Sequence, residues 1–127
     1  MTIYRPLHVT QGQLDSWRDK WQKQLGLTDW KVTVTMVPAK ALQPNLGDIN
    51  WDNDQLTAVI RVLRPEYYPH EGPWVLTDME YTVLHELIHL ELHGLEGDPS
   101  TVERAVNGLG DALFFPKTKI LYSQEGH

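Results

Sequence analysis

The sequence contains no cysteine, no long apolar run and no cluster of basic residues. Without cysteine among its 127 residues, the chain can form neither a disulfide scaffold nor a cysteine zinc ribbon. No stretch approaches the roughly 20 apolar residues that cross a bilayer, and the N-terminal MTIYRPLHVT lacks a signal-peptide core. A net charge of −6 argues against nucleic acid or an anionic membrane as main partner. We therefore expect a cytoplasmic protein with a single domain, residues 1–127.

The residues with the most specific chemistry lie in one stretch, residues 77–94, TDMEYTVLHELIHLELHG. On a helix, His85 and His89 fall about 40° apart on one face and roughly 6 Å apart along the axis, so both imidazoles can reach one metal ion. Glu86 lies next to that face and is placed to accept a proton from a water on the metal, as in the H-E-x-x-H pattern of zinc metalloproteases. A pair of satisfied core histidines is the alternative interpretation.

Capping signals predict that this helix covers residues 78–93. Thr77 and Glu80 have the spacing of a capping box, and Gly94 is a natural stop. Apolar residues lie on nearly every side of the helix, which is typical of a helix buried within a domain.

Two histidines leave a tetrahedral catalytic zinc ion short of one protein ligand. His93 lies roughly 12 Å along a straight helix from His85, so we expect it beside the site or on the surface. Glu103 is the best candidate. It lies on the last helix of the chain, and a short turn can bring that helix back beside the helix that carries His85 and His89. Asp98 is a further acid, but it more naturally caps the last helix.

The last helix is predicted to end at Phe115, before Pro116. Ser100 and Glu103 have capping-box spacing, which would occupy the Glu103 carboxylate locally, but Asp98 followed by Pro99 offers another start. Glu103, Asn107 and Gly110 share one stripe of this helix.

Periodicity predicts an α+β fold for the remainder. A helix begins near Thr10 and ends at Gly26, and strands follow at residues 30–37, 46–51 and 56–63, the last two paired as a hairpin. The result is an N-terminal helix, a small, mostly antiparallel three-stranded sheet, the metal-binding helix and a C-terminal helix. We expect the strand 56–63 to be an edge that an extended peptide could join.

Two other groups of polar residues allow functional interpretations. The acids Asp48, Asp52 and Asp54 invite a calcium site, but without the glycine and terminal glutamate of a calcium loop they indicate an ordinary turn. In the loop of residues 64–74, the candidates to donate to a developing oxyanion are His70, Tyr67 and Tyr68. Loop aromatics and histidines usually have no catalytic role.

The chain from His85-Glu-Leu-Ile-His89 to Glu103-Arg-Ala-Val-Asn107-Gly-Leu-Gly-Asp-Ala-Leu113-Phe-Phe-Pro116 resembles the ImmA/IrrE group of bacterial and phage metallopeptidases. Those proteins pair H-E-x-x-H with a downstream pattern close to E-x-x-A-N-x-F-A-x-x-L-L-x-P. The resemblance covers about the last third of the chain with specific motifs. It implies a cytoplasmic, minimal zincin-like fold of the gluzincin type, a glutamate ligand on the last helix, and a phage or prophage origin.

The expected mechanism is zinc-dependent hydrolysis of a peptide bond. His85, His89 and Glu103 would hold Zn²⁺, and Glu86 would take a proton from the activated water and pass it to the leaving amine. The expected partner is a protein or peptide substrate, for which a repressor or other regulator is a candidate, with no nucleic acid or membrane partner.

Other functions are compatible with the same residues. One is a zinc-dependent amidase that acts on a non-peptide substrate, and another is a catalytically silent zincin-like binding or regulatory module. A metal-dependent ribonuclease of the H-x-x-x-H-x-x-x-x-x-H type is excluded, because Leu95 occupies the third histidine position.

Overall fold

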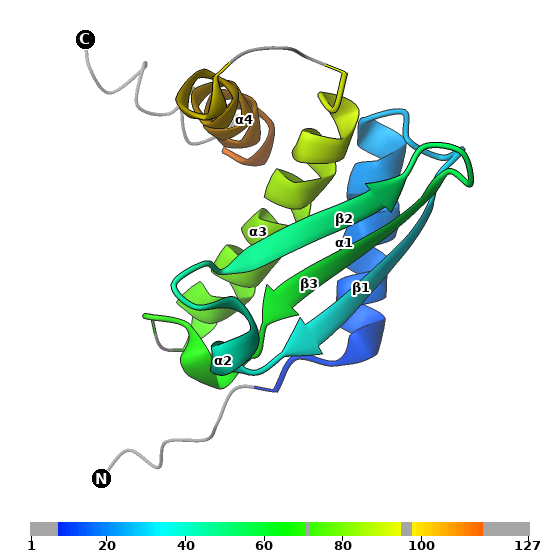
Figure 1. The fold of residues 1–127 in the computed structure, drawn as a ribbon. Coiled ribbons are helices and arrows are strands. Elements are labelled where there is room, and N and C mark those ends of the chain that lie inside the picture. Colours follow the sequence, from blue (N-terminus) through cyan, green and yellow to red (C-terminus); the bar gives the residue numbers. More distant parts are fainter. Residues whose placement is uncertain (1–7, 71, 95–97, 116–127) are drawn as a thin grey trace, which may run out of the picture.

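The structure, a computed structural model, describes residues 8–70, 72–94 and 98–115. Within these ranges the chain forms four α-helices, one short 3₁₀-helix and a three-stranded sheet (Figure 1). The elements in chain order are α1 (Gln11–Gln24), β1 (Lys31–Val37), α2 (Ala39–Leu42), β2 (Gly47–Asp52), β3 (Thr57–Leu63), η1 (Pro65–Tyr67), α3 (Pro73–Glu91) and α4 (Pro99–Phe114).

The first helix follows its sequence signals. The Thr10 hydroxyl accepts a hydrogen bond from the Gln13 N–H at 3.1 Å, and the Gln13 side chain accepts one from the Thr10 N–H at 2.9 Å. This reciprocal capping box satisfies two backbone donors that the first helical turn leaves free. After α1, Gly26 takes a φ of 69°, a left-handed conformation that glycine adopts without steric cost. The predicted helix is therefore confirmed at both ends.

The sheet has the order β1-β3-β2, so the strand at residues 57–63 lies in its centre. β2 and β3 pair antiparallel as the predicted hairpin, whereas β1 and β3 run parallel. The expectation of a mostly antiparallel sheet was wrong, and the sheet is mixed. The expectation that residues 56–63 form an edge was also wrong, because both neighbours already use the backbone groups of β3. The free edge near the later helices belongs to β2.

The helices α1 and α3 cover one face of the sheet, and α4 packs against α3 on the side of β2 (Figure 1). The core lies between the covered sheet face and the two helices. Its fully buried side chains are Leu14, Val34, Ile60, Val62, Leu63, Met79, Val83, Leu84, Leu87, Ile88, Leu90 and Val106. None of the helices in the described ranges has the length and apolar character needed to cross a bilayer.

The helix α3 begins five residues before the predicted start. Gly72 is its N-cap, with a φ of 64°, and Pro73 occupies the first helical position, where a missing N–H costs nothing. Thr77 and Glu80 consequently lie inside the helix, and the predicted capping box does not form. The predicted end at residue 93 was also late, because the helix ends at Glu91.

Glu80 instead connects α3 to α1. One of its carboxylate oxygens accepts a hydrogen bond from the indole N–H of Trp21 at 2.8 Å and pairs with Lys20 at 3.0 Å. The Trp21 side chain is buried, so its N–H needs an acceptor from the protein. This bond fixes the position of α3 against α1.

Replacing Glu80 by alanine should lower the free energy of unfolding by about 2 kcal/mol, because the indole N–H of Trp21 would be buried without a partner. Glu80→Gln keeps an acceptor oxygen and should cost clearly less. Lys20→Ala should cost under about 1 kcal/mol, because this exposed ion pair is screened by water. Urea denaturation of the three variants measures these differences, and equal costs for Glu80→Ala and Lys20→Ala would contradict the assignment.

Candidate functional site

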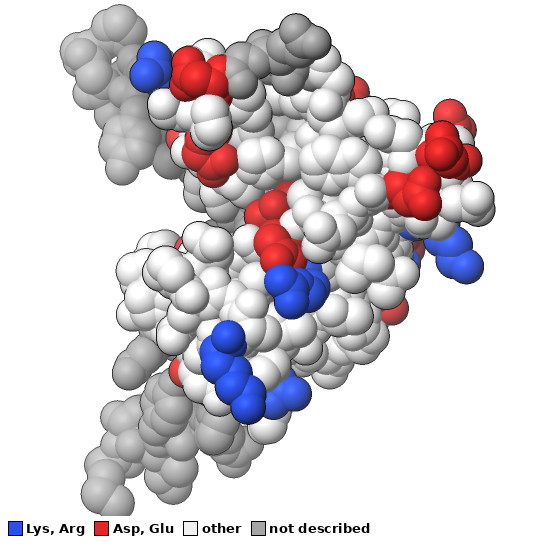
Figure 2. All heavy atoms as spheres, in the orientation of Figure 1, with Lys and Arg blue, Asp and Glu red and all other residues white. Residues whose placement is uncertain are grey.

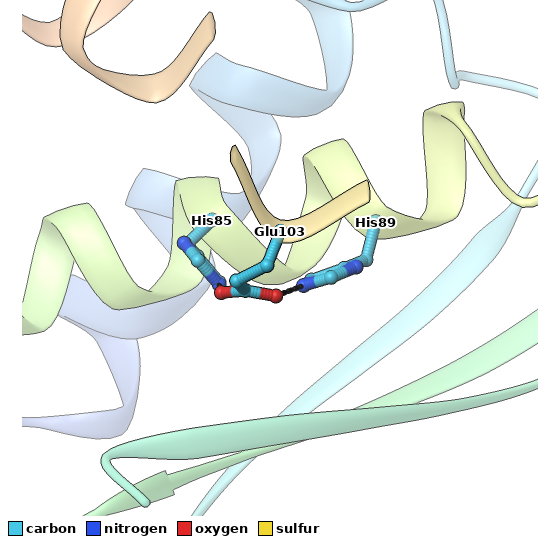
Figure 3. A group of neighbouring side chains, drawn as sticks. All are labelled: His85, His89 and Glu103. Carbon is cyan, nitrogen blue, oxygen red and sulfur yellow. Dashed lines mark ion pairs between the residues drawn. The ribbon is translucent and has the colours of Figure 1, made fainter. Parts of the chain in front are cut away.

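The side chains of His85, His89 and Glu103 meet between α3 and α4 (Figure 3). The Nε2 atom of His85 lies 2.9 Å from one oxygen of Glu103, and the Nε2 atom of His89 lies 3.1 Å from the other. Figure 3 shows both rings turned toward the carboxylate that α4 presents between them. Each residue offers a ligand atom, and these atoms lie within 4.8 Å of one another, so the group could hold a metal ion.

Glu103 is free to reach the histidines because another residue caps its helix. The Asp98 side chain accepts a hydrogen bond from the Thr101 N–H at 2.9 Å, and Pro99 follows at the first helical position. The alternative capping box between Ser100 and Glu103 is therefore not used. Val106 and Gly110 are buried on α4, so the helix presents Glu103 on the face that packs toward α3.

The chemistry of this donor set suits a divalent transition metal. Two imidazole nitrogens and one carboxylate are the protein ligands of one class of catalytic zinc site, with a further position left for water. Burial lowers the pKa of His85, and the nearby His89 lowers it further, although Glu103 acts in the opposite direction. A neutral imidazole is the form that binds a metal, so burial favours the ligand form of His85.

Glu86 lies beside the histidines and is buried. Burial, together with the negative charges of Glu103 and Asp48, raises its pKa from the ordinary 4.5 to about 8. A carboxyl group in such a position can hold or release a proton near neutral pH, which is the property of a general acid or base.

The metal group, which consists of His85, His89 and Glu103, lines a cleft of about 850 Å³ together with Glu86. Its walls come from α3, from α4, from β2 and from the segment that leads into β2. The lining residues are residues 44–49, Trp51, Tyr81, Thr82, His85, Glu86, His89, Glu103 and Asn107. Figure 2 shows the molecule hollowed between α4 and the lower part of the sheet. The volume is in the range of ordinary ligand-binding clefts.

The position of β2 in this cleft depends on Gly47. A Cβ atom at residue 47 would lie 2.6 Å from the Cγ2 atom of Thr82 and 3.0 Å from the carbonyl oxygen of Arg61. The same Cβ would lie 3.6 Å from a carboxylate oxygen of Glu86. Glycine therefore permits the backbone of β2 to approach α3 beside the buried acid.

His93 lies outside the metal group, as its distance along the helix predicts. Its Nδ1 atom is 2.6 Å from the carbonyl oxygen of Leu90, and its ring centre is 5.8 Å from those of Trp30 and Trp51. Its ring therefore links the end of α3 to two aromatic residues of the sheet region.

None of the three oxyanion candidates from the loop lines the cleft. The Tyr68 side chain is buried, and its hydroxyl donates to Thr82 at 3.1 Å, while burial raises its pKa to about 12. Tyr67 is exposed, and His70 lies 3.6 Å from Asp78 at the start of α3.

The three acids of the hairpin form no metal group in the described ranges. Asp48 pairs with Arg61 across β2 and β3 through two contacts, one of them at 2.9 Å. Asp52 accepts hydrogen bonds from the N–H groups of Asp54 and Gln55 at 2.9 and 3.2 Å, which is an Asx turn. The prediction of an ordinary turn is confirmed.

Tyr81 and Asn107 also line the cleft, and sequence reasoning assigned neither of them to it. Each lies four residues from a member of the metal group, Tyr81 before His85 and Asn107 after Glu103, which is the spacing of one helix face. That spacing was visible in the sequence. The contribution of residues 44–49 had no such signal, because it depends on how the hairpin packs against α3.

Comparison of the chain with protein-family models, with curated proteins and with solved structures finds no match. The similarity to the ImmA/IrrE group therefore rests on the two quoted motifs alone.

The pKa of Glu86 predicts a pH dependence of stability for the metal-free protein. Because the fold raises this pKa to about 8, the folded chain holds the proton more tightly than the unfolded chain does. The stabilisation is complete below about pH 4.5 and is lost as the pH rises through 8. Denaturation in the presence of a chelator should therefore show Glu86→Gln gaining stability over the wild type between pH 5 and pH 9, by up to a few kcal/mol. A difference that does not change with pH would contradict the raised pKa.

Proposed function

We propose that this protein is a zinc-dependent metallopeptidase with a minimal zincin-like fold. The observation that carries the proposal is the convergence of His85, His89 and Glu103 at one point, with the buried Glu86 beside them in an open cleft. A structural metal site requires neither an adjacent acid of raised pKa nor a cleft. The similarity of the motifs to the ImmA/IrrE group adds support from the sequence.

His85, His89 and Glu103 are the residues that would hold the ion. Bound there, zinc would supply an activated water and a polarising charge for the substrate carbonyl. Glu86 is the general base of this proposal: it accepts the proton of the attacking water and delivers it to the leaving amine. Its pKa of about 8 in the metal-free protein would fall beside a cation, which would leave the carboxylate ionised and able to accept a proton.

The edge of β2 gives an extended peptide a place to bind. The N–H of Leu63 donates to the carbonyl of Leu46 at 2.9 Å, so the backbone groups of Leu46 point toward β3. In the register of the two strands, every second residue does the same, which includes Asp48 and Asn50. Because an antiparallel ladder alternates its bonding direction, the backbone groups of Gly47 and Ile49 point away from β3. A peptide that pairs with this edge would lie along the cleft that the metal group lines.

Elemental analysis of the purified protein tests the metal site. We expect near-stoichiometric zinc in the wild type and in Glu86→Gln, because Glu86 is not a ligand in this proposal. His89→Ala and Glu103→Ala should each lose most of the zinc, since they remove one of three protein ligands. A wild type that takes up no zinc after reconstitution would contradict the metallopeptidase proposal.

Peptide cleavage by the zinc-loaded protein tests the reaction and the binding edge. We expect the wild type to cut members of a proteome-derived peptide library, read by mass spectrometry, and Glu86→Gln to be at least about a hundredfold slower. Ile49→Pro removes a backbone N–H from the free edge and should abolish most cleavage. The control Ile49→Ala keeps the N–H and should therefore keep most of the cleavage.

Each outcome of this experiment has a separate meaning. Zinc-loaded wild type that leaves every peptide intact would contradict peptidase activity and favour a catalytically silent binding module. Cleavage that persists in a folded Ile49→Pro variant would remove the β2 edge from the proposal and leave the reaction standing.

A further inference from the structure

Tyr81 reaches from the metal-binding helix to α4. Its hydroxyl donates to a carboxylate oxygen of Asp111 at 3.0 Å. Its ring centre lies 5.6 Å from that of Phe114, edge to face, and 6.1 Å from that of Phe115, stacked. Within the described ranges, the hydrogen bonds and ion pairs between α3 and α4 are this bond and the two contacts of Glu103 with the histidines.

Gly110 makes room for the Tyr81 hydroxyl. A Cβ atom at residue 110 would lie 2.9 Å from the hydroxyl oxygen and 3.3 Å from the ring carbon that carries it. Any larger residue would therefore push the tyrosine away from α4. Gly110 is buried, and the tyrosine covers it on the side of α3. Gly110, which leaves room for the hydroxyl, and Asp111, which accepts its hydrogen bond, are adjacent residues of α4.

The two polar attachments add to the apolar packing of Val106 in fixing how α4 lies on α3. Glu103 and Asp111 are eight residues apart, which is about 12 Å along a helix axis. A helix held at one point can still rotate or slide, and a slip by one residue turns every side chain by about 100° and moves it by about 1.5 Å. A second attachment at Tyr81 removes that freedom. It also limits where the carboxylate of Glu103, whose side chain is 49% exposed, can be placed.

We infer that Tyr81 is a positioning residue of the metal site: its hydroxyl, bonded to Asp111 over Gly110, holds α4 so that Glu103 meets His85 and His89. The inference depends on the proposed metal site and adds a residue to it. Its physical basis is preorganisation, because a ligand already in place loses less conformational entropy when the ion binds. Burial and the charges of Asp111 and Glu103 raise the pKa of Tyr81 to about 12, so the phenol remains a proton donor at neutral pH.

A double-mutant cycle on zinc affinity tests this role. The zinc dissociation constant is measured by competition with a chromogenic chelator for the wild type, Tyr81→Phe, Glu103→Ala and the double variant. Tyr81→Phe keeps the ring contacts and removes the hydroxyl, so we expect zinc binding to weaken about tenfold, as for other residues that orient metal ligands. In the Glu103→Ala background, the same change should have no effect, because the ligand that Tyr81 positions is absent.

Two further variants separate positioning from general stability. Asp111→Ala removes the acceptor of the Tyr81 hydroxyl at an exposed position of α4 and should weaken zinc binding in the same direction, without disturbing the tyrosine ring. Tyr68→Phe is the matched control, because it removes a buried hydroxyl that donates to Thr82 of α3, within the same helix as the histidines. It should leave zinc affinity unchanged.

The outcomes distinguish this inference from the function on which it depends. Equal weakening by Tyr81→Phe in the presence and absence of Glu103 would assign the effect to the fold or to the histidine pair and overturn the inference. So would unchanged affinity in Tyr81→Phe while the wild type binds zinc, and in that case the metallopeptidase proposal would stand. Failure of the wild type to bind zinc would overturn both. If Tyr81→Phe does not fold, Asp111→Ala in the same cycle decides.

Discussion

The contact of one carboxylate with two imidazoles determines the arrangement of the whole site. His85 and His89 are neighbours on α3 by helical geometry alone, and they would lie side by side in an isolated helix. Glu103 comes from the next helix and reaches them only when α4 packs correctly. The site is therefore a tertiary feature built on a local one, and the packing of α4 decides whether three ligand atoms meet or only two.

Acidic residues line the cleft beside this contact. Glu103 and Asp48 contribute negative charge, and their repulsion adds to burial in raising the pKa of Glu86. A cation in the cleft would be attracted by both carboxylates and would favour the ionised form of Glu86. The same charges would oppose binding of an anionic ligand at the histidines. Arg61 offsets part of this charge, because it pairs with Asp48.

The sequence predicted the positions of the main helices and strands well, but it predicted the order and direction of strand pairing less well. Helical and alternating periodicity placed α1 and all three strands to within a residue or two, and the turn formers at residues 52–54 predicted the hairpin. Periodicity says nothing about which strand is central. In the structure β3 is central, and it pairs parallel with β1. The start of α3 was misplaced, because two signals competed and the Gly72-Pro73 pair determined the start instead of Thr77.

The same limit applies to the site. His85, Glu86 and His89 were apparent from spacing within one helix, and Glu103 from the short connection that follows. The role of Gly47 and the bond between Tyr81 and Asp111 depend on close contacts between elements, and no pattern along the chain encodes those contacts.

The attachment of α4 has a consequence for how the protein responds to its surroundings. An ion that binds across α3 and α4 stabilises the docked state of α4 by mass action, and the gain grows with the logarithm of the free ion concentration. Few of the fully buried side chains belong to α4, whereas most belong to α1, α3 and the sheet. Opening of α4 therefore requires less free energy than global unfolding. If the site holds a metal ion, its occupancy and the order of the last helix would form one coupled equilibrium, and metal supply would then set the compactness of this end of the molecule.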